Sequence, residues 1–77
     1  MNKSEVSLLF GKELKRVRSS RGLSQEALAL EADIDRSFLS KLERGVRQPT
    51  ITVIFKLCNA LDYRPEKLVE SVRSGIT

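Results

Sequence analysis

The sequence predicts a small all-α fold of five helices, and three observations support this prediction. Apolar residues recur at spacings of three and four along most of the chain, as on the buried face of a helix, and no strand pattern is present. Capping residues, glycines and prolines divide these patterns into five segments. The 77 residues are 40% apolar, which suffices for one compact core. We therefore expect residues 1–77 to form a single domain.

The first predicted helix follows frayed residues 1–3, is capped by Ser4 or Ser7 and ends near Ser20. Its apolar residues have spacings of four, four and three: Val6, Phe10, Leu14 and Val17. Gly22 then supplies the left-handed turn that often closes a helix. Its outer face carries four basic residues: Lys12, Lys15, Arg16 and Arg21. This face is either an ordinary solvated surface or a surface that contacts phosphate groups.

The second predicted helix is short and begins after Ser24, a good N-cap residue. Its inner face is narrow and made of small residues around one leucine, which allows another helix to approach closely: Leu28, Ala29 and Ala32. Only two residues separate Ala32 from Asp35, the predicted cap of the next helix. We therefore expect a tight turn and a steep angle between the two helices, with Ile34 as the apolar residue of the turn.

The third predicted helix, residues 36–44, has a polar arc without a carboxylate. A step of about 100° per residue places five side chains on an arc of roughly 140°: Arg36, Ser37, Ser40, Lys41 and Arg44. Phe38, Leu39 and Leu42 fall on the opposite side, and Glu43 points toward the core side. Guanidinium, ammonium and hydroxyl groups suit an anionic surface that presents hydrogen-bonding edges. Double-stranded DNA is such a surface.

Two further helices are predicted after a loop that contains Arg47 and Gln48. Thr50 caps the fourth, whose inward residues are Ile51, Ile54, Leu57, Cys58 and Leu61, with Phe55 off this stripe. Pro65 suits the first position of the fifth, whose inward residues are Leu68, Val69 and Val72. This helix is expected to end at Gly75, which leaves residues 75–77 frayed.

Composition argues against an enzyme and against a metal or cofactor site. The chain has no histidine, no cluster of metal-ligating residues and no phosphate-binding glycine loop. Its single cysteine, Cys58, is predicted to be a buried filler rather than a reactive thiol. No apolar run could span a bilayer and no signal peptide is recognisable, so we expect a cytoplasmic protein. The net charge of +4 and the pI near 9.6 favour an acidic partner.

Several segments together resemble the helix-turn-helix family of the lambda repressor and Cro, also called Xre-like. They are residues 21–26, 28–29, 34–40, 42–45, 49–51 and 60–61. The resemblance covers roughly residues 8–70 and implies a compact five-helix DNA-binding domain whose helix-turn-helix core spans about residues 24–45. Residues 35–40 and 43–47 are also similar to controller proteins of restriction–modification systems.

The resemblance also implies roles for individual residues. Arg36, Ser37 and Lys41 stand where the family contacts base edges, and Gln25 stands where a glutamine clamps a phosphate. Contacts with the DNA backbone are expected from Ser40, Arg44, Arg47 and Gln48. Arg18 and Glu43 match an ion pair that joins the first helix to the recognition helix. Asp33 and Asp62 replace the usual turn glycines and are expected to adopt the left-handed conformation.

One recognition helix contacts only a few base pairs, so we expect a homodimer on half-sites about 34 Å apart. The apolar residues left over for an interface are Phe55, Tyr63, Val69 and Ile76, unless each is partly buried in its own subunit. The leading functional hypothesis is a sequence-specific transcriptional regulator that binds an operator, possesses no effector domain and is autoregulatory or controller-like. The alternative is an antitoxin-type protein-interaction module that also binds DNA.

Overall fold

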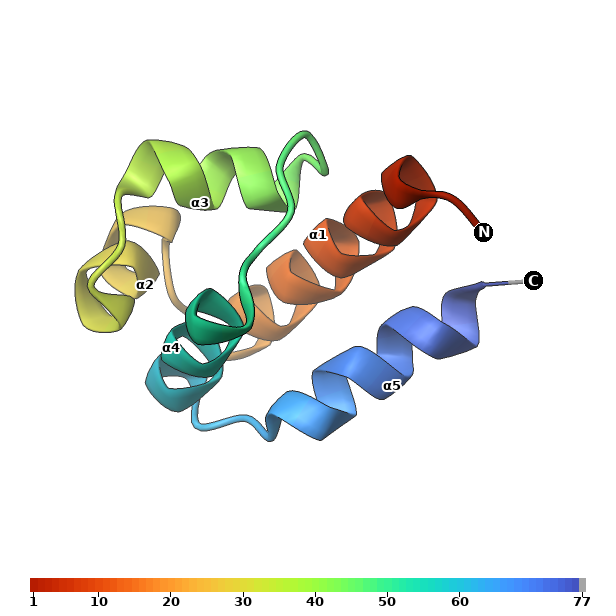
Figure 1. The fold of residues 1–77 in the computed structure, drawn as a ribbon. Helices are drawn as coiled ribbons and strands as arrows, with labels where there is room; N and C mark the ends of the chain where they lie inside the picture. Colours follow the sequence, from red (N-terminus) through yellow and green to blue (C-terminus); the bar gives the residue numbers. More distant parts are fainter. Residues whose placement is uncertain (77) are drawn as a thin grey trace.

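The computed structural model describes residues 1–76, and within that range it contains five α-helices and no strand (Figure 1). The helices are α1 (Lys3–Ser20), α2 (Gln25–Ala32), α3 (Arg36–Glu43), α4 (Ile51–Leu61) and α5 (Pro65–Gly75). The predicted all-α fold of five helices is confirmed. Helix α5 ends at Gly75 as predicted, but Gly75 itself is helical and is not frayed. Thr77, which was also predicted to be frayed, lies outside the described residues. None of the helices within residues 1–76 has the length and apolar character of a membrane span.

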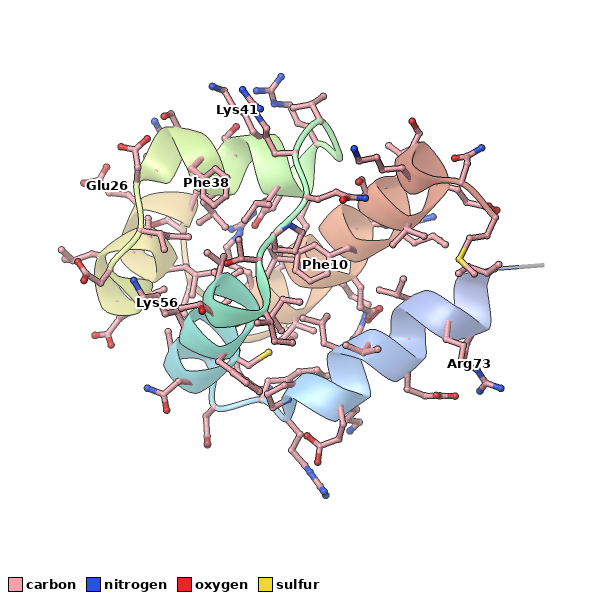
Figure 2. The ribbon with its side chains drawn as sticks, viewed as in Figure 1. Phe10, Glu26, Phe38, Lys41, Lys56 and Arg73 are labelled. Carbon is pink, nitrogen blue, oxygen red and sulfur yellow. The ribbon has the colours of Figure 1, made fainter. Side chains whose placement is uncertain are left out.

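Helix α1 supports two of the other four helices directly. It packs against α3 and α5, while α2 packs against α3 and α4. The core between the helices is built largely of leucines, and Phe10 lies near its centre (Figure 2). Its fully buried members are Leu14, Leu28, Leu39, Leu42, Leu57, Leu61, Leu68, Val17 and Cys58. Cys58 is thus a buried filler, as predicted, and burial raises the pKa of its thiol.

The start of α1 differs from the prediction. Asn2 is the N-cap, because its side-chain oxygen accepts a hydrogen bond from the Glu5 backbone N–H at 2.8 Å. Asparagine caps a helix as well as serine does, and its position two residues before Ser4 lets the helix begin at Lys3. The predicted caps were therefore wrong, as was the fraying of Lys3. Ser4 lies inside the helix, and Ser7 is buried on its inner face.

The connection between α2 and α3 follows the predicted chemistry. The Ser24 side chain caps α2 by accepting from the Ala27 backbone N–H at 3.0 Å. Asp33 closes α2 in the left-handed conformation, with φ 56°, and the Ile34 N–H donates to the Ala29 carbonyl at 3.0 Å. Ile34 packs against the core. This short turn fixes the angle between the helices of the helix-turn-helix.

A glycine inside α1 brings α3 unusually close to it. A Cβ atom on Gly11 would lie 2.3 Å from the Leu42 carbonyl oxygen and 2.5 Å from the Glu43 carbonyl oxygen. Both atoms belong to the backbone of α3, so no side-chain movement could relieve the contact. The absence of a side chain at Gly11 therefore allows the last turn of α3 to rest directly on α1.

Helices α4 and α5 bury narrower stripes than the sequence predicted. Thr50 caps α4 as predicted, and Leu57, Cys58 and Leu61 are buried. Ile51, however, is 66% exposed, because it lines the open hollow between α4 and α5 instead of the core. The inward placement of Val69 was also wrong, since this side chain is 51% exposed. Leu68 and Val72 alone form the buried stripe of α5.

Candidate nucleic-acid interface

Helix α3 has one face in the core and the other in solvent. Leu39 and Leu42 are fully buried, and Phe38 packs against the core cluster. Figure 2 shows Phe38 on the inner side of α3 and Lys41 directed away from the molecule. The outer face carries the side chains of the predicted polar arc, of which three are exposed and two are half-buried: Arg36, Ser37, Arg44, Ser40 and Lys41. Helix α3 ends one residue earlier than predicted, and Arg44 is its C-cap.

Ser37 is engaged with the residue that precedes the helix. Asp35 has the backbone conformation of an N-cap, but its side chain accepts no capping hydrogen bond and instead accepts one from the Ser37 hydroxyl. That hydrogen bond lowers the pKa of Asp35 below its ordinary value, and the nearby Lys41 charge adds a smaller effect. Because the hydroxyl proton of Ser37 is used in this way, the exposed oxygen of Ser37 remains available as a hydrogen-bond acceptor.

A buried ion pair joins α1 to the end of α3. The Arg18 Nε lies 2.6 Å from Glu43 Oε2, and Arg18 Nη2 donates to Glu43 Oε1 at 3.0 Å, so the pair is bidentate. The side chains are 11% and 2% exposed, respectively. A third donor, Arg18 Nη1, binds the Leu23 carbonyl oxygen at 2.7 Å. The hydrogen bonds from Arg18 to Glu43 raise the pKa of Arg18. The pair that the resemblance implied is thus present.

Gln25 belongs to the same network. It is the first residue of α2, and its Nε2 donates to Glu43 Oε1 at 3.0 Å. A glutamine amide nitrogen carries two protons, so this bond orients the amide and leaves one N–H for a ligand. The free backbone N–H groups at the start of α2 favour an anion at the same place. The geometry therefore suits the phosphate contact that the resemblance implied.

The segment after α3 lies beside the first turn of α1 (Figure 1). Arg47 and Gln48 are exposed, and Gln48 Nε2 donates to the Lys3 carbonyl oxygen at 3.3 Å. Gly45 adopts φ 78°, and a Cβ atom there would lie 2.7 Å from Leu8 Cδ2. Of the two predicted backbone-contacting residues, Gln48 is thus held against α1, and Arg47 is exposed beside it.

The basic face of α1 serves more than one purpose. Arg21 donates to the Leu61 carbonyl at 2.9 Å and to the Asp62 carbonyl at 3.2 Å. These hydrogen bonds provide donors for carbonyl groups at the C-terminus of α4, where no helical N–H is available. Its guanidinium also lies 5.7 Å from the centre of the Tyr63 ring. Arg16 pairs with Glu13. Arg21 is therefore occupied within the protein, which argues against a phosphate contact by this residue.

The predicted interface residues are only partly brought together. Phe55 and Val69 are exposed and line one hollow of about 370 Å³ between α4 and α5, together with Ile51. Tyr63, which is half-buried, lines a neighbouring hollow of about 490 Å³ that also contains Phe55. Ile76 caps the far end of α5 and lines neither hollow. Sequence reasoning missed Ile51, although its position directly after a helix cap was a signal of exposure.

Three comparisons with known proteins agree with this architecture. A helix-turn-helix family profile matches residues 14–68. Control protein C.BamHI of Bacillus amyloliquefaciens is 36% identical over 73 residues, which cover 94% of this chain and 90% of that protein. An HTH-type transcriptional regulator of Sinorhizobium fredii, y4dJ, which is described as uncharacterized, is 36% identical over 65 residues, or 84% of each chain.

A solved structure of a controller protein is also similar to this chain in both fold and sequence. The restriction-modification controller protein C.AhdI from Aeromonas hydrophila superposes with a TM-score of 0.79 and 42% sequence identity, over 80% of this chain and 94% of that one. The resemblance identified from the sequence is confirmed by these matches. A profile match to more than half of the residues, with relatives matched almost end to end, shows that the chain belongs to the helix-turn-helix family.

Proposed function

We propose that this chain is a sequence-specific transcriptional regulator that binds double-stranded DNA through α3 in the major groove. The outward arc of cationic and hydroxyl side chains on α3, held from behind by a buried apolar face, is the observation that carries the proposal. Arg36 suits a bidentate contact with guanine O6 and N7, and Lys41 suits guanine or phosphate. Ser37 offers an acceptor to a base amino group. A regulator of this kind needs no catalytic site, and we propose that it acts in the cytoplasm.

The remaining contacts would position α3 without carrying sequence information. Gln25 stands at the start of α2, Ser40 and Arg44 flank the base-contacting residues, and Arg47 and Gln48 follow the helix. Hydrogen bonds from such side chains to phosphate oxygens set the register of a protein on the duplex. The net charge of +4 adds the general attraction to an anionic polymer.

Substitution of Arg36 and Arg47 tests these separate roles. Arg36→Ala is expected to weaken operator binding by about 1–3 kcal/mol and to relax discrimination at one base pair. Arg47→Ala is expected to weaken binding evenly on all sequences and to flatten the salt dependence by about one unit. Gel shifts on a duplex selected from a random pool, and on its scrambled version, at several salt concentrations measure both effects. Equal losses on the two duplexes for Arg36→Ala would remove it from the base-contacting role.

We propose further that two copies bind as a homodimer through the surface of α4 and α5. An isolated recognition helix contacts few base pairs, and a two-fold dimer doubles them on half-sites one helical turn apart. Phe55 and Val69, exposed beside Ile51, supply the apolar surface. Tyr63 extends this surface. Ile76, at the C-terminal end of α5, would lie at the edge of this dimer surface.

A charge placed in this surface tests the dimer. Val69→Glu is expected to weaken self-association at least tenfold, because it adds a carboxylate to an apolar contact beside Glu66 and Glu70. Leu30→Glu is the matched control, since Leu30 is exposed on α2 and lies outside the proposed surface. Sedimentation velocity over a concentration series measures both variants. A dimer that survives Val69→Glu and dissociates with Leu30→Glu would contradict this assignment.

The biological role that fits best is that of an autoregulatory controller. C.BamHI is named a control protein, and C.AhdI a restriction-modification controller protein. These names support the controller hypothesis over the antitoxin alternative. Controller action would activate transcription at low operator occupancy and repress it at high occupancy. A methyltransferase or endonuclease gene beside this one, and a reporter driven by its upstream region, test the proposal; co-purification with a small toxin would instead support the alternative.

A further inference from the structure

The turn that follows α3 carries an exposed apolar side chain beside the outer arc of that helix. Val46 is 60% exposed. Figure 1 shows this turn at the outer side of the molecule, level with α3. Among residues 36–48, all of which the structure describes, the other exposed side chains are polar: Arg36, Ser37, Arg44, Arg47 and Gln48. Val46 is therefore an isolated apolar group among cations, an amide and a hydroxyl.

The backbone holds Val46 in a fixed place at the end of α3. Its N–H donates to the Lys41 carbonyl at 3.0 Å, and the Gly45 N–H donates to the Leu42 carbonyl at 3.1 Å. With Gly45 at φ 78°, these two bonds form the Schellman motif that closes many helices. A Cβ atom on Gly45 would lie 2.9 Å from the Leu8 Cα, so the turn rests directly on α1. Val46 is thus positioned next to Lys41 before any DNA is bound.

Helix α3 does not provide the apolar partner that usually accompanies this motif. The residue that follows the left-handed glycine commonly packs on a side chain in the last two turns of the helix. In α3 the side chains at those positions are Lys41 and Ser40, which are polar. The methyl groups of Val46 consequently remain in solvent. Because valine is branched at Cβ and stiff at χ1, a contact with a ligand would cost it little conformational entropy.

The chemistry of the major groove indicates which group suits Val46. Base edges there present hydrogen-bond donors and acceptors and one apolar group, the C5-methyl of thymine. A polar base edge or a phosphate oxygen would lose water against Val46 without gaining a hydrogen bond. Contact with the thymine methyl instead removes apolar surface of both partners from water.

We propose that Val46 contacts the C5-methyl group of a thymine and so contributes to the choice of operator. The inference rests on the proposed function, in which α3 occupies the major groove. Val46 adjoins Lys41, which is directed away from the molecule (Figure 2). Arg36 stands at the other end of α3, so Val46 and Arg36 contact different base pairs. The operator therefore has a thymine in each half-site at a position that Arg36 does not contact.

Removal of single methyl groups from the DNA tests this contact. Uracil replaces each thymine of the selected duplex in turn, which deletes the methyl group and retains the base pair. At one thymine of each half-site, the replacement is expected to weaken wild-type binding about fourfold, the factor that corresponds to burial of one methyl group. Val46→Ala is expected to bind the thymine duplex about fourfold more weakly and to be insensitive to uracil at that position. Gel-shift titrations at fixed salt measure both effects.

Two further variants separate a contact with DNA from a structural effect. Val46→Ile keeps the apolar surface and should retain the sensitivity to uracil. Leu30→Ala removes an exposed apolar side chain from α2 and should change neither the affinity nor the sensitivity. The hydrogen bond of Val46 uses its backbone and its side chain is exposed, so Val46→Ala should keep the fold. Urea unfolding of each variant checks this.

The outcomes distinguish failure of the contact from failure of the function. A wild-type chain that binds no duplex would overturn the proposed function, and the Val46 contact with it. A wild-type chain that binds but is insensitive to uracil at every thymine would overturn the contact alone, as would Val46→Ala with the sensitivity of wild type. Equal weakening of Val46→Ala on the selected and the scrambled duplex would assign the side chain to the sugar-phosphate backbone and contradict the proposal.

Discussion

Glu43→Ala is expected to lower the free energy of unfolding by about 3–5 kcal/mol, because it leaves the Arg18 guanidinium charged in a nearly dry site. Glu43 is 2% exposed and accepts three hydrogen bonds, two from Arg18 and one from Gln25. A domain of this size has about 5–15 kcal/mol of total stability, so the loss would be a large part of it. Urea denaturation followed by circular dichroism measures the change.

A double-mutant cycle separates the ion pair from the packing of its members. Arg18→Ala should cost a similar amount, and the double variant should cost clearly less than the sum, because neither charge is then left alone. Glu70→Ala is the control, since its pair with Arg73 is exposed and should contribute less than about 1 kcal/mol. Losses for Arg18→Ala and Glu43→Ala that simply add would show that the two residues act independently.

The contribution of this pair should not vary with pH near neutrality. The pKa of Arg18 is raised in the folded chain, so its stabilising effect is complete below the ordinary arginine pKa. It would be lost only as the pH rises through the raised value, far above the neutral range. The difference in unfolding free energy between wild type and Glu43→Ala should therefore be constant from pH 6 to pH 8, within about 0.5 kcal/mol.

Gly11→Ala is expected to destabilise the protein by about 3 kcal/mol, although alanine is the better helix former. The added carbon would lie 2.3 Å from the Leu42 carbonyl oxygen and 2.8 Å from the Glu43 carbonyl carbon. These are backbone atoms of α3, so α1 and α3 would have to separate. The separation would also strain the bidentate contact of Arg18 with Glu43, which lies at the same junction. Thermal and urea unfolding measure the loss.

Gly75→Ala is the control for this substitution. A Cβ atom on Gly75 would lie 2.7 Å from Leu9 Cδ2, the end of a flexible side chain that can move aside. We expect a change within about 1 kcal/mol. If Gly11→Ala were as stable as wild type, the close approach of α1 and α3 would not be needed for the fold, and the described packing of Gly11 would be contradicted.

The positions of the helices were largely predictable because they depend on residues near one another in the chain. The Ser24 and Thr50 caps and Pro65 at the start of α5 each act within one helical turn. Asp33 and Asp62 take the left-handed conformation that was expected of them. The start of α1 was predicted wrongly because Asn2, Ser4 and Ser7 can all cap a helix, and local sequence alone does not rank them.

The candidate site was predictable in part. The helical periodicity of residues 36–44 predicted which side chains share the outer arc of α3. The resemblance to the family predicted the ion pair between Arg18 and Glu43. The use of Arg21 at the end of α4 and the hydrogen bond from Gln25 to Glu43 were not predicted. Each joins residues from different helices, so no pattern within one segment could have shown it.

The sequence by itself determined the five helices, the arc of α3 and the family, because caps, helical periodicity and motif spacing are local properties. Only the tertiary structure decided that Ile51 and Val69 face solvent, that Gly11 touches the α3 backbone and that Gln25 donates to Glu43. Periodicity indicates which side chains share a face of a helix. What lies opposite that face depends on how far the neighbouring helices reach, and that is settled only when the helices pack together.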